Sequence, residues 1–362
     1  MEITAAVLRT NDGPYALEPV ELAEPRADEV LVRVVGAGMC HTDVIPRGEV
    51  SFSPPPIITG HEGAGVVEAV GADVEGIAVG DHVVLSFDSC GSCEMCLAGV
   101  PAHCETFLVR NMLGRRVDFT TGVTDASGAE ITSRWFGQSS FATHCLATAR
   151  NTVVVDKSLP LEKLGPLGCG IQTGAGSVLV ALDVQPGQSI VVFGAGAVGL
   201  AAVMAAVVAE AATIIAVDLH EHRLDLAREL GATHVVDGSA ADLVAQVQAI
   251  TGGGAHHSID TTGVPAVMQN ALGALRLGGK AGFVGVQAGE LVLDPIALIG
   301  KTAVGILEGN TDPHTFIPRM IELWQAGRFP FDRLIEEFPL AEINEAEAAS
   351  LSGRVIKPVL IP

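Results

Sequence analysis

One stretch constrains the fold of this chain more than any other. Residues 190–209, IVVFGAGAVGLAAVMAAVVA, carry no charged side chain, and a run of this length is a candidate membrane span by length alone. Near its start, however, Gly194, Gly196 and Gly199 form the pattern G-x-G-x-x-G. A strand that leads into such a glycine turn and then into a helix is typical of dinucleotide-binding units. The sequence therefore predicts a buried strand, turn and helix.

The motif and the strand after it predict the cofactor. Gly194 permits the tight turn, Gly196 lets the backbone approach a pyrophosphate, and Gly199 allows close helix–strand packing. The next predicted strand ends at Asp218, whose carboxylate can accept hydrogen bonds from both hydroxyls of an adenosine ribose. Because this carboxylate would repel a 2′-phosphate, NAD is expected rather than NADP. Arg223, on the next turn, is a second candidate ribose contact.

Secondary structure is expected in two patterns. From about 186, strands at 190–194, 213–217, 234–236, 257–261, 281–286 and 302–306 alternate with helices at 221–230, 240–250 and 265–276. This alternation predicts an α/β fold with a doubly wound parallel sheet. The first 150 residues instead predict short strands between turns, with an irregular lobe at 105–140. The tail, with a helix at 315–326 and strands near 335–340 and 354–360, returns to this mixed pattern.

Composition excludes several classes of protein. Apolar residues make up 48% and charged residues 17%, which excludes disorder. Asp plus Glu number 42 against 21 Lys plus Arg, a net charge of −21, so we expect no binding to nucleic acid or to a membrane surface. The start of the chain, Met1-Glu2-Ile3-Thr4, lacks the basic residues of a signal peptide, so a cytoplasmic location is expected.

Four of the seven cysteines are closely spaced. Cys90, Cys93, Cys96 and Cys104 form the pattern C-x2-C-x2-C-x7-C. Such clustering in a cytosolic chain indicates a metal rather than disulfides. Four thiolates can close a tetrahedron around one zinc ion and leave no open position, which makes the site structural. The spacing also resembles an iron–sulfur pattern, and soft thiolates suit either metal.

A second set of candidate metal ligands is dispersed: Cys40, His61 and Cys169. Two thiolates and one imidazole neutralise a zinc ion and leave its fourth position open, as catalytic zinc requires. Taken singly, His61 is more often a satisfied loop histidine and Cys169 a small buried side chain. The hypothesis of a catalytic zinc site therefore rests on the three residues taken together.

At these residues the chain resembles the zinc-dependent medium-chain alcohol dehydrogenases. That family's signature is matched by Gly60-His61-Glu62-x2-Gly65-x5-Gly71-x2-Val74, and the cysteine lobe, the LGCG around Cys169, the glycine loop and Asp218 follow in the family's order. The resemblance covers essentially the whole chain. It implies a GroES-like β-rich catalytic domain formed by 1–169 and 309–362, a Rossmann NAD-binding domain at 170–308, and two zinc ions per chain.

The resemblance also implies a role for each metal-site residue. Cys40, His61 and Cys169 are expected to bind the catalytic zinc, and the four clustered cysteines the structural zinc. Glu62 is expected close behind the catalytic metal, and Asp43 is expected to fix the orientation of His61. Thr42 is the hydroxyl expected to take the substrate proton.

Further cofactor contacts carry over by position. Thr173 and Val198 are expected against the nicotinamide ring, and Lys357 on the pyrophosphate. The chain departs from the family twice: His41 replaces an arginine used on the pyrophosphate, and Ile45 replaces the histidine that ends the proton relay in better-known relatives. The remaining cysteine, Cys145, is predicted to lie in the core.

The favoured function is reversible, NAD-dependent oxidation of a primary alcohol to the aldehyde. The pattern is most similar to aryl-alcohol (benzyl alcohol) dehydrogenases, so aromatic or allylic substrates are expected. Phe87, Trp135 and Phe136 are candidate pocket walls or, equally, ordinary core. The alternatives are an S-(hydroxymethyl)glutathione or formaldehyde dehydrogenase, and, from another class, a zinc-free quinone reductase or a structural protein on the same fold. Retention of the 105–140 lobe favours a homodimer, with a homotetramer as the alternative.

Overall fold

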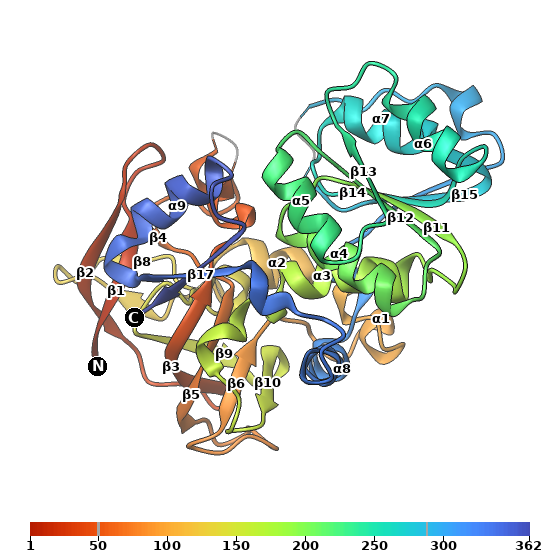
Figure 1. Ribbon diagram of the computed structural model, residues 1–362. Helices are drawn as coiled ribbons and strands as arrows, with labels where there is room; N and C mark the ends of the chain where they lie inside the picture. Colours follow the sequence, from red (N-terminus) through yellow and green to blue (C-terminus); the bar gives the residue numbers. More distant parts are fainter. Residues whose placement is uncertain (49–50, 287–288) are drawn as a thin grey trace. The chain divides into compact units, whose positions relative to one another are not determined.

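The structure, a computed structural model, describes residues 1–48, 51–286 and 289–362 (Figure 1). They form two compact units. The first unit comprises Met1–Cys169, Asp312–Pro318 and Asp332–Pro362, and the second comprises Gly170–Thr311 and Arg319–Phe331. The sequence prediction assigned all of 309–362 to the catalytic domain, whereas 309–311 and Arg319–Phe331 belong to the second compact unit. An amphipathic helix pattern shows that a helix buries one face, but it does not show which unit covers that face.

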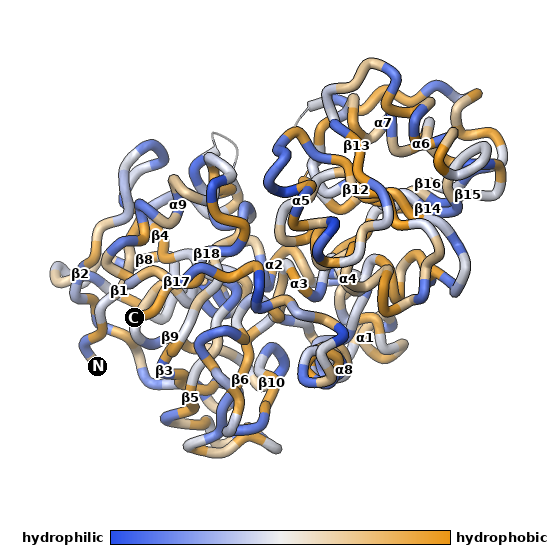
Figure 2. The backbone as a smooth tube through the Cα atoms, viewed as in Figure 1, coloured by the Kyte–Doolittle hydropathy of each residue, from blue (hydrophilic) through white to orange (hydrophobic). Residues whose placement is uncertain are grey.

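The second unit contains a six-stranded sheet in the order β13-β12-β11-β14-β15-β16, and every neighbouring pair is parallel. This is the predicted doubly wound arrangement. Two inner strands of the sheet, β11 (SIVVF) and β12 (TIIAVD), are almost continuously apolar, as expected of strands covered on both faces, and Figure 2 shows this along β12. The elements are β11 Ser189–Phe193, β12 Thr213–Asp218, β13 His234–Asp237, β14 Ala255–Asp260, β15 Leu275–Phe283, β16 Thr302–Gly305, α3 Gly170–Gly176, α4 Ala197–Val208, α5 Glu221–Glu229, α6 Leu243–Thr251 and α7 Pro265–Gly273.

The uncharged run of residues 190–209 is strand β11, the glycine turn and helix α4, as predicted. The five residues of β11 and eight residues of α4, from Gly199 to Ala206, are buried. No helix within the described ranges has both the length and the apolar character needed to cross a bilayer. The run is apolar because it forms the centre of a folded unit.

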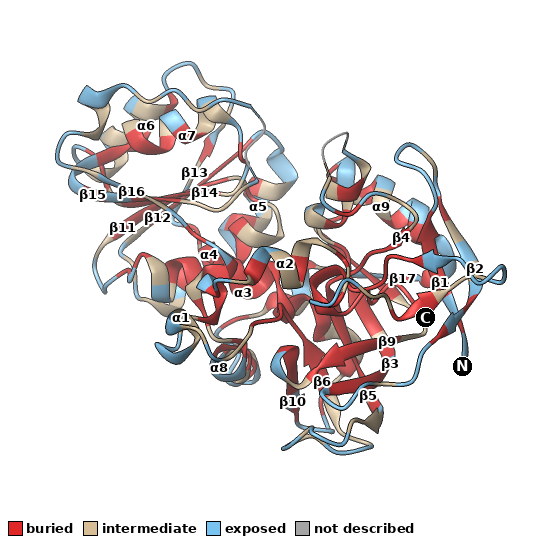
Figure 3. Ribbon diagram, turned by 180° about the vertical axis from the view of Figure 1, so that it is seen from behind, coloured by how far each residue is buried: buried red, intermediate tan, exposed pale blue. Residues whose placement is uncertain are grey.

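The first unit contains two sheets. One has the order β4-β1-β2-β7-β8, and the other has the order β10-β6-β5-β3-β18-β17, with β9 also paired to β3. Figure 3 shows β3, β6 and β9 buried along most of their length. The elements are β1 Glu2–Leu8, β2 Tyr15–Leu22, β3 Glu29–Gly38, β4 Ile57–Ile58, β5 Glu62–Val70, β6 His82–Leu85, β7 Val123–Thr124, β8 Glu130–Ile131, β9 His144–Thr148, β10 Thr152–Val155, β17 Ile335–Pro339, β18 Lys357–Ile361, α1 Glu94–Leu97, α2 Phe107–Met112 and α9 Ile343–Leu351; helix α8, Pro313–Gln325, begins in this unit and ends in the second.

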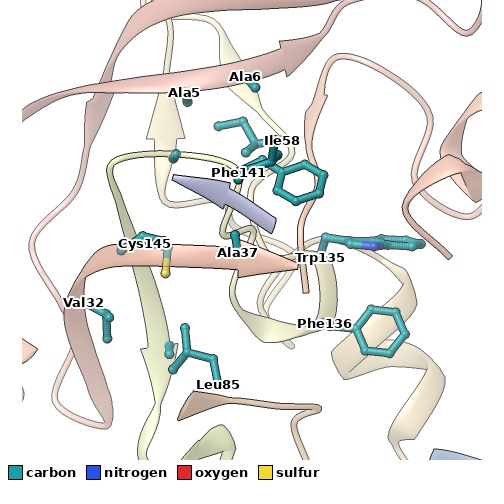
Figure 4. Close-up of a cluster of buried hydrophobic side chains, with 14 of the residues drawn as sticks. Ala5, Ala6, Val32, Ala37, Ile58, Leu85, Trp135, Phe136, Phe141 and Cys145 are labelled. Atoms are coloured by element: carbon teal, nitrogen blue, oxygen red, sulfur yellow. The ribbon is translucent and has the colours of Figure 1, made fainter. Parts of the chain in front are cut away.

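An apolar core lies between these strands (Figure 4). Cys145 is buried in it with 2% exposure, as predicted. Trp135, Phe136 and Phe141 belong to the same core, and Trp135 is fully buried. Strands β3 and β5, whose ends precede or follow the candidate metal ligands, pack against this core.

Candidate metal centres and nucleotide site

Sheet register brings the first two ligands of the dispersed set together. Strand β3 pairs with β5 so that Gly38 faces Glu62, and Cys40 and His61 therefore lie just beyond the paired ends of these two strands. Cys169 follows a short 3-10 helix, Gly165–Gly168, that packs against the same place. A Cβ on Gly165 would lie 2.1 Å from the carbonyl oxygen of Glu62, so only glycine allows this approach.

The ligand atoms are close enough for one metal ion. One atom each from Cys40, His61, Glu62 and Cys169 lie within 4.8 Å of one another. The Nε2 atom of His61 is 3.2 Å from the Sγ of Cys169. A tetrahedral zinc ion would set such a nitrogen–sulfur distance at about 3.6 Å, from its usual bond lengths. The donor set and the spacing therefore fit a zinc ion after a shift of a few tenths of an ångström.

Asp43 is placed to orient His61. Its buried carboxylate accepts hydrogen bonds from His61 Nδ1 at 2.8 Å, from the Gly60 amide at 2.9 Å and from the Cys40 amide at 3.1 Å. With Nδ1 donating, Nε2 is left for a metal. Burial lowers the pKa of His61, but the Asp43 carboxylate and the Cys40 thiolate outweigh it and raise this pKa well above its ordinary value. Hydrogen bonding to Cys169 holds the pKa of Cys40 well below its ordinary value, against the effect of burial.

Glu62 and Lys357 form a buried ion pair beside these ligands. The Lys357 Nζ lies 2.9 Å from each Glu62 carboxylate oxygen and 3.0 Å from the carbonyl oxygen of Met39. Burial lowers the pKa of Lys357, but Glu62 outweighs it, and the pKa is raised above its ordinary value. All three N–H donors are engaged within the first unit. In this structure the charge of Lys357 neutralises Glu62, and its expected contact with a pyrophosphate stays a prediction.

The four clustered cysteines form a second candidate metal centre. Their ligand atoms also lie within 4.8 Å of one another. The Sγ atoms of Cys90 and Cys96 are 3.9 Å apart, and those of Cys93 and Cys104 are 4.0 Å apart. A ZnS4 tetrahedron has edges of about 3.8 Å. Burial raises the pKa of Cys96 to about 12, so a cation is needed to keep all four thiols ionised. The spacing fits a single ion better than a multi-iron cluster, whose thiolates bind different iron atoms.

The glycine turn of the second unit has the geometry of a phosphate site. Gly194 has a φ of +90°, and a Cβ on Gly199 would lie 1.7 Å from the Gly194 carbonyl oxygen. Apart from its two neighbours in the chain, no described residue lies within 4 Å of the position of a Cβ on Gly196, which leaves its backbone accessible. Asp218 ends β12, where its carboxylate accepts from the Ala195 amide at 2.7 Å and the His220 amide at 2.9 Å.

Three further candidates for cofactor binding also lie in the second unit. The Arg223 guanidinium is 3.9 Å from the carboxylate of Asp218, so both reach the end of β12. Thr173 on α3 is next to Gly174, where a Cβ would lie 2.1 Å from the carbonyl oxygen of Val198. The expected nicotinamide contacts, Thr173 and Val198, are thus brought together by close packing of α3 on α4.

The segment between Cys40 and Gly48 carries the remaining catalytic candidate. A 3-10 helix, His41–Arg47, places the Thr42 Oγ1 3.7 Å from the Cys40 Sγ. Thr42 and Ile45 are half-buried, whereas His41 is exposed. Ile45 packs against the apolar core, so no ionisable group replaces the relay histidine at this position.

The three aromatic candidates for pocket walls are buried. Phe87 contacts Phe107, with ring centroids 5.7 Å apart, and lines a small cavity beside Cys96. Trp135 is fully buried, as ordinary core. Phe136 differs, because its ring lies 4.5 Å from the imidazole of His61. Of the three, Phe136 is the one in contact with the candidate zinc ligands.

Two polar residues near these sites were not predicted. Gln138 is fully buried and hydrogen-bonds to the backbone of His61 and Gly63. Glu308 is buried and accepts from Gln172 Nε2 at 3.2 Å and Thr173 Oγ1 at 3.3 Å. Neither residue belongs to a recognisable motif. The groups with which they form hydrogen bonds are distant in sequence, so no local signal could have identified them.

Comparison with known proteins identifies relatives across the whole chain. Residues 26–157 match the alcohol dehydrogenase GroES-like domain, and residues 197–326 match the zinc-binding dehydrogenase family. A geraniol dehydrogenase of Castellaniella defragrans is 48% identical, with 99% of this chain and 97% of the relative aligned. A probable S-(hydroxymethyl)glutathione dehydrogenase 1 of Schizosaccharomyces pombe is 34% identical over 98% of this chain and 96% of the relative.

The fold comparison agrees with the sequence comparison. The crystal structure of benzyl alcohol dehydrogenase from Acinetobacter calcoaceticus superposes with a TM-score of 0.95 at 43% identity, covering 100% of this chain and 99% of that structure.

Proposed function

This chain belongs to the zinc-dependent medium-chain alcohol dehydrogenases, and from that premise we propose that it oxidises aromatic or allylic primary alcohols reversibly to aldehydes, with NAD as the hydride acceptor. The observation that carries the proposal is the cluster of Cys40, His61 and Cys169, three zinc-type ligands within reach of one ion. Zinc-free quinone reductases and structural proteins on this fold need no such cluster. The presence of the cluster therefore argues against both of these alternatives.

Two zinc ions per chain are part of this proposal. One would be held by Cys40, His61 and Cys169, and it would supply a Lewis acid for the substrate oxygen. The other would be held by the four-cysteine cluster and would stabilise the fold. The Sγ–Sγ distances of 3.9 and 4.0 Å in that cluster support this assignment.

The chain's own residues handle the proton. Thr42 carries the one hydroxyl of the His41–Arg47 helix, beside Cys40, and takes the substrate proton. Because Ile45 cannot ionise, it cannot relay the proton onward from Thr42. The ribose hydroxyl of a bound NAD would supply the next group on the way to water, with at most weak help from His41. Asp43 holds His61 in the tautomer that leaves Nε2 for the metal.

NAD is supported by the acidic residue at the end of β12. The Asp218 carboxylate lies beside the Ala195 amide of the glycine turn, where an adenosine ribose would be bound. The substrate class is supported by the named relatives. Geraniol and benzyl alcohol are both primary alcohols whose carbinol carbon adjoins a π system.

A substrate panel with purified enzyme and NAD tests the function. We expect kcat/KM for benzyl alcohol and geraniol to exceed that for ethanol by at least about tenfold, because each additional methylene in an apolar pocket contributes about 1–3 kcal/mol. Ethanol matching benzyl alcohol would refute the substrate class. Formaldehyde with glutathione belongs in the same panel, and preference for that mixture would favour the S-(hydroxymethyl)glutathione dehydrogenase alternative.

A homodimer in the cytoplasm completes the proposal. Among the described strands, β16 ends the six-stranded sheet, and an edge strand offers unpaired backbone groups to a second copy. Leu277, Ile296 and Ile299 are exposed in the same unit. Six of the seven cysteines are assigned to the two zinc sites, which fits a reducing compartment that keeps thiols out of disulfides. Light scattering after size exclusion should give twice the chain mass; four times that mass would support the tetramer.

A further inference from the structure

The segment Trp135–Ser139 has an unusual backbone. Phe136, Gly137 and Ser139 have φ values of 50°, 69° and 55°. Two non-glycine residues so close together in the left-handed region are costly, and such strain persists where the surrounding contacts over-determine it. Figure 4 shows Trp135 and Phe136 from this segment with the core side chains. The side chains of this segment contact His61, one of the candidate zinc ligands.

The segment contacts His61 in two ways. The ring of Phe136 lies on the imidazole, with centroids 4.5 Å apart and an interplanar angle of 30°. Gln138 donates from Nε2 to the carbonyl oxygen of His61 at 2.9 Å and accepts at Oε1 from the Gly63 amide at 3.0 Å. Gln138 is fully buried, so these bonds form out of contact with water. The segment therefore restrains both the ring and the backbone of this ligand.

Gln138 also connects His61 to the opposite zinc ligand. Its Nε2 donates to the carbonyl oxygen of Ser86 at 3.1 Å, and the Oγ of Ser86 donates to the carbonyl oxygen of Gly168 at 2.6 Å. Gly168 directly precedes Cys169. Asn151 donates to Ser86 at 3.2 Å and to Phe136 at 3.3 Å, both at the carbonyl oxygen, and so supports the same connection.

We propose that Gln138 and Ser86 form a buried hydrogen-bonded bridge that sets the separation of His61 and Cys169 and thereby slows loss of the catalytic zinc. The inference rests on the proposed zinc site. Both are positioning residues, since they act through the backbone of the two ligands. The bridge is distinct from the Asp43 contact, which orients the imidazole but does not connect it to Cys169.

Zinc release tests the bridge. The holoenzymes of the parent, Ser86→Ala and Gln138→Met are exposed to a colorimetric chelator, and release is followed in time. Gln138→Met keeps the side-chain volume, and Ser86→Ala removes one hydroxyl. Because loss of outer contacts typically lowers metal affinity by about 10- to 100-fold, we expect one of the two zinc ions to leave at least about tenfold faster in each variant. The ion in the four-cysteine cluster serves as an internal reference in the same unit.

A matched control and a second readout complete the test. Ser140 is a fully buried serine whose Oγ has no hydrogen-bond partner among the described residues, so Ser140→Ala should release zinc as the parent does. Cobalt substituted at the catalytic site should show a shifted visible spectrum in both bridge variants. The inference is overturned if the two bridge variants release zinc no faster than Ser140→Ala does. It is also overturned if zinc release from both metal sites is accelerated equally. A parent that holds fewer than two zinc ions overturns the proposed function instead.

Discussion

Replacing Lys357 by methionine should destabilise the first unit strongly. The side chains of Lys357 and Glu62 are 2% and 0% exposed, and the amine lies 2.9 Å from both carboxylate oxygens. Removing one partner of such a pair leaves a buried charge uncompensated, which costs about 3–5 kcal/mol. A double variant, Glu62→Gln with Lys357→Met, should recover most of this loss because no unpaired charge remains.

Urea unfolding measured by tryptophan fluorescence provides the assay. The chain has 2 tryptophans, and a Trp324→Phe background leaves Trp135, which is buried in the first unit. Arg354→Met is the matched control. The Arg354 side chain is 55% exposed and lies 3.6 Å from Glu336, so its loss should cost less than about 1 kcal/mol. If Lys357→Met stays within about 1 kcal/mol of the parent but raises the KM for NAD, the pyrophosphate contact would be right and the ion-pair reasoning refuted.

Four further predictions concern catalysis, cofactor, metal and pH. Thr42→Ala should lower kcat by about 100- to 10,000-fold while Thr42→Ser stays active, and a loss within about twofold in steady-state kinetics would leave Thr42 a packing role only. The parent should prefer NAD over NADP by at least about 100-fold in kcat/KM, because bringing a 2′-phosphate up to the carboxylate of Asp218 costs about 3 kcal/mol. Asp218→Gly should remove most of this preference, and comparable kcat/KM values in the parent would contradict the prediction. Cys93→Ser should lower the free energy of unfolding, whereas brief chelation of the parent should abolish turnover first; elemental analysis that finds one metal per chain, or iron, would contradict the two-zinc assignment. Burial and Lys280 lower the pKa of His257 to about 4, so between about pH 6.5 and pH 4 the unfolded chain binds a proton that the folded chain does not, and the free energy of unfolding should fall as the pH drops through this range. His257→Gln should flatten that part of the plot of stability against pH, and an unchanged slope would count against this cause.

The second unit is largely predictable from sequence because its signals are local. Strands β11 and β12 are short apolar runs, strands alternate with helices along the chain, and the structure has all six strands in the doubly wound order. The glycine turn combines a φ of +90° at Gly194 with a 1.7 Å approach at Gly199, and both conditions allow only glycine. The spacing of the four clustered cysteines likewise encodes a compact loop. Such features were predicted because the residues that interact are also neighbours in sequence.

Tertiary structure decided what the metal centres are packed against. Glu62 and Lys357 are 295 residues apart, and only the pairing of β18 with β3 beside β5 brings them together. The sequence shows that a cation stands at position 357, but it does not show that Glu62 is the anion beside it. Gln138 belongs to no motif. Its role follows from its hydrogen bonds to three backbone groups, which belong to His61, Gly63 and Ser86 on two other segments. Local sequence determines backbone conformation and ligand type, whereas the pairing of buried polar groups depends on long-range packing that no local pattern encodes.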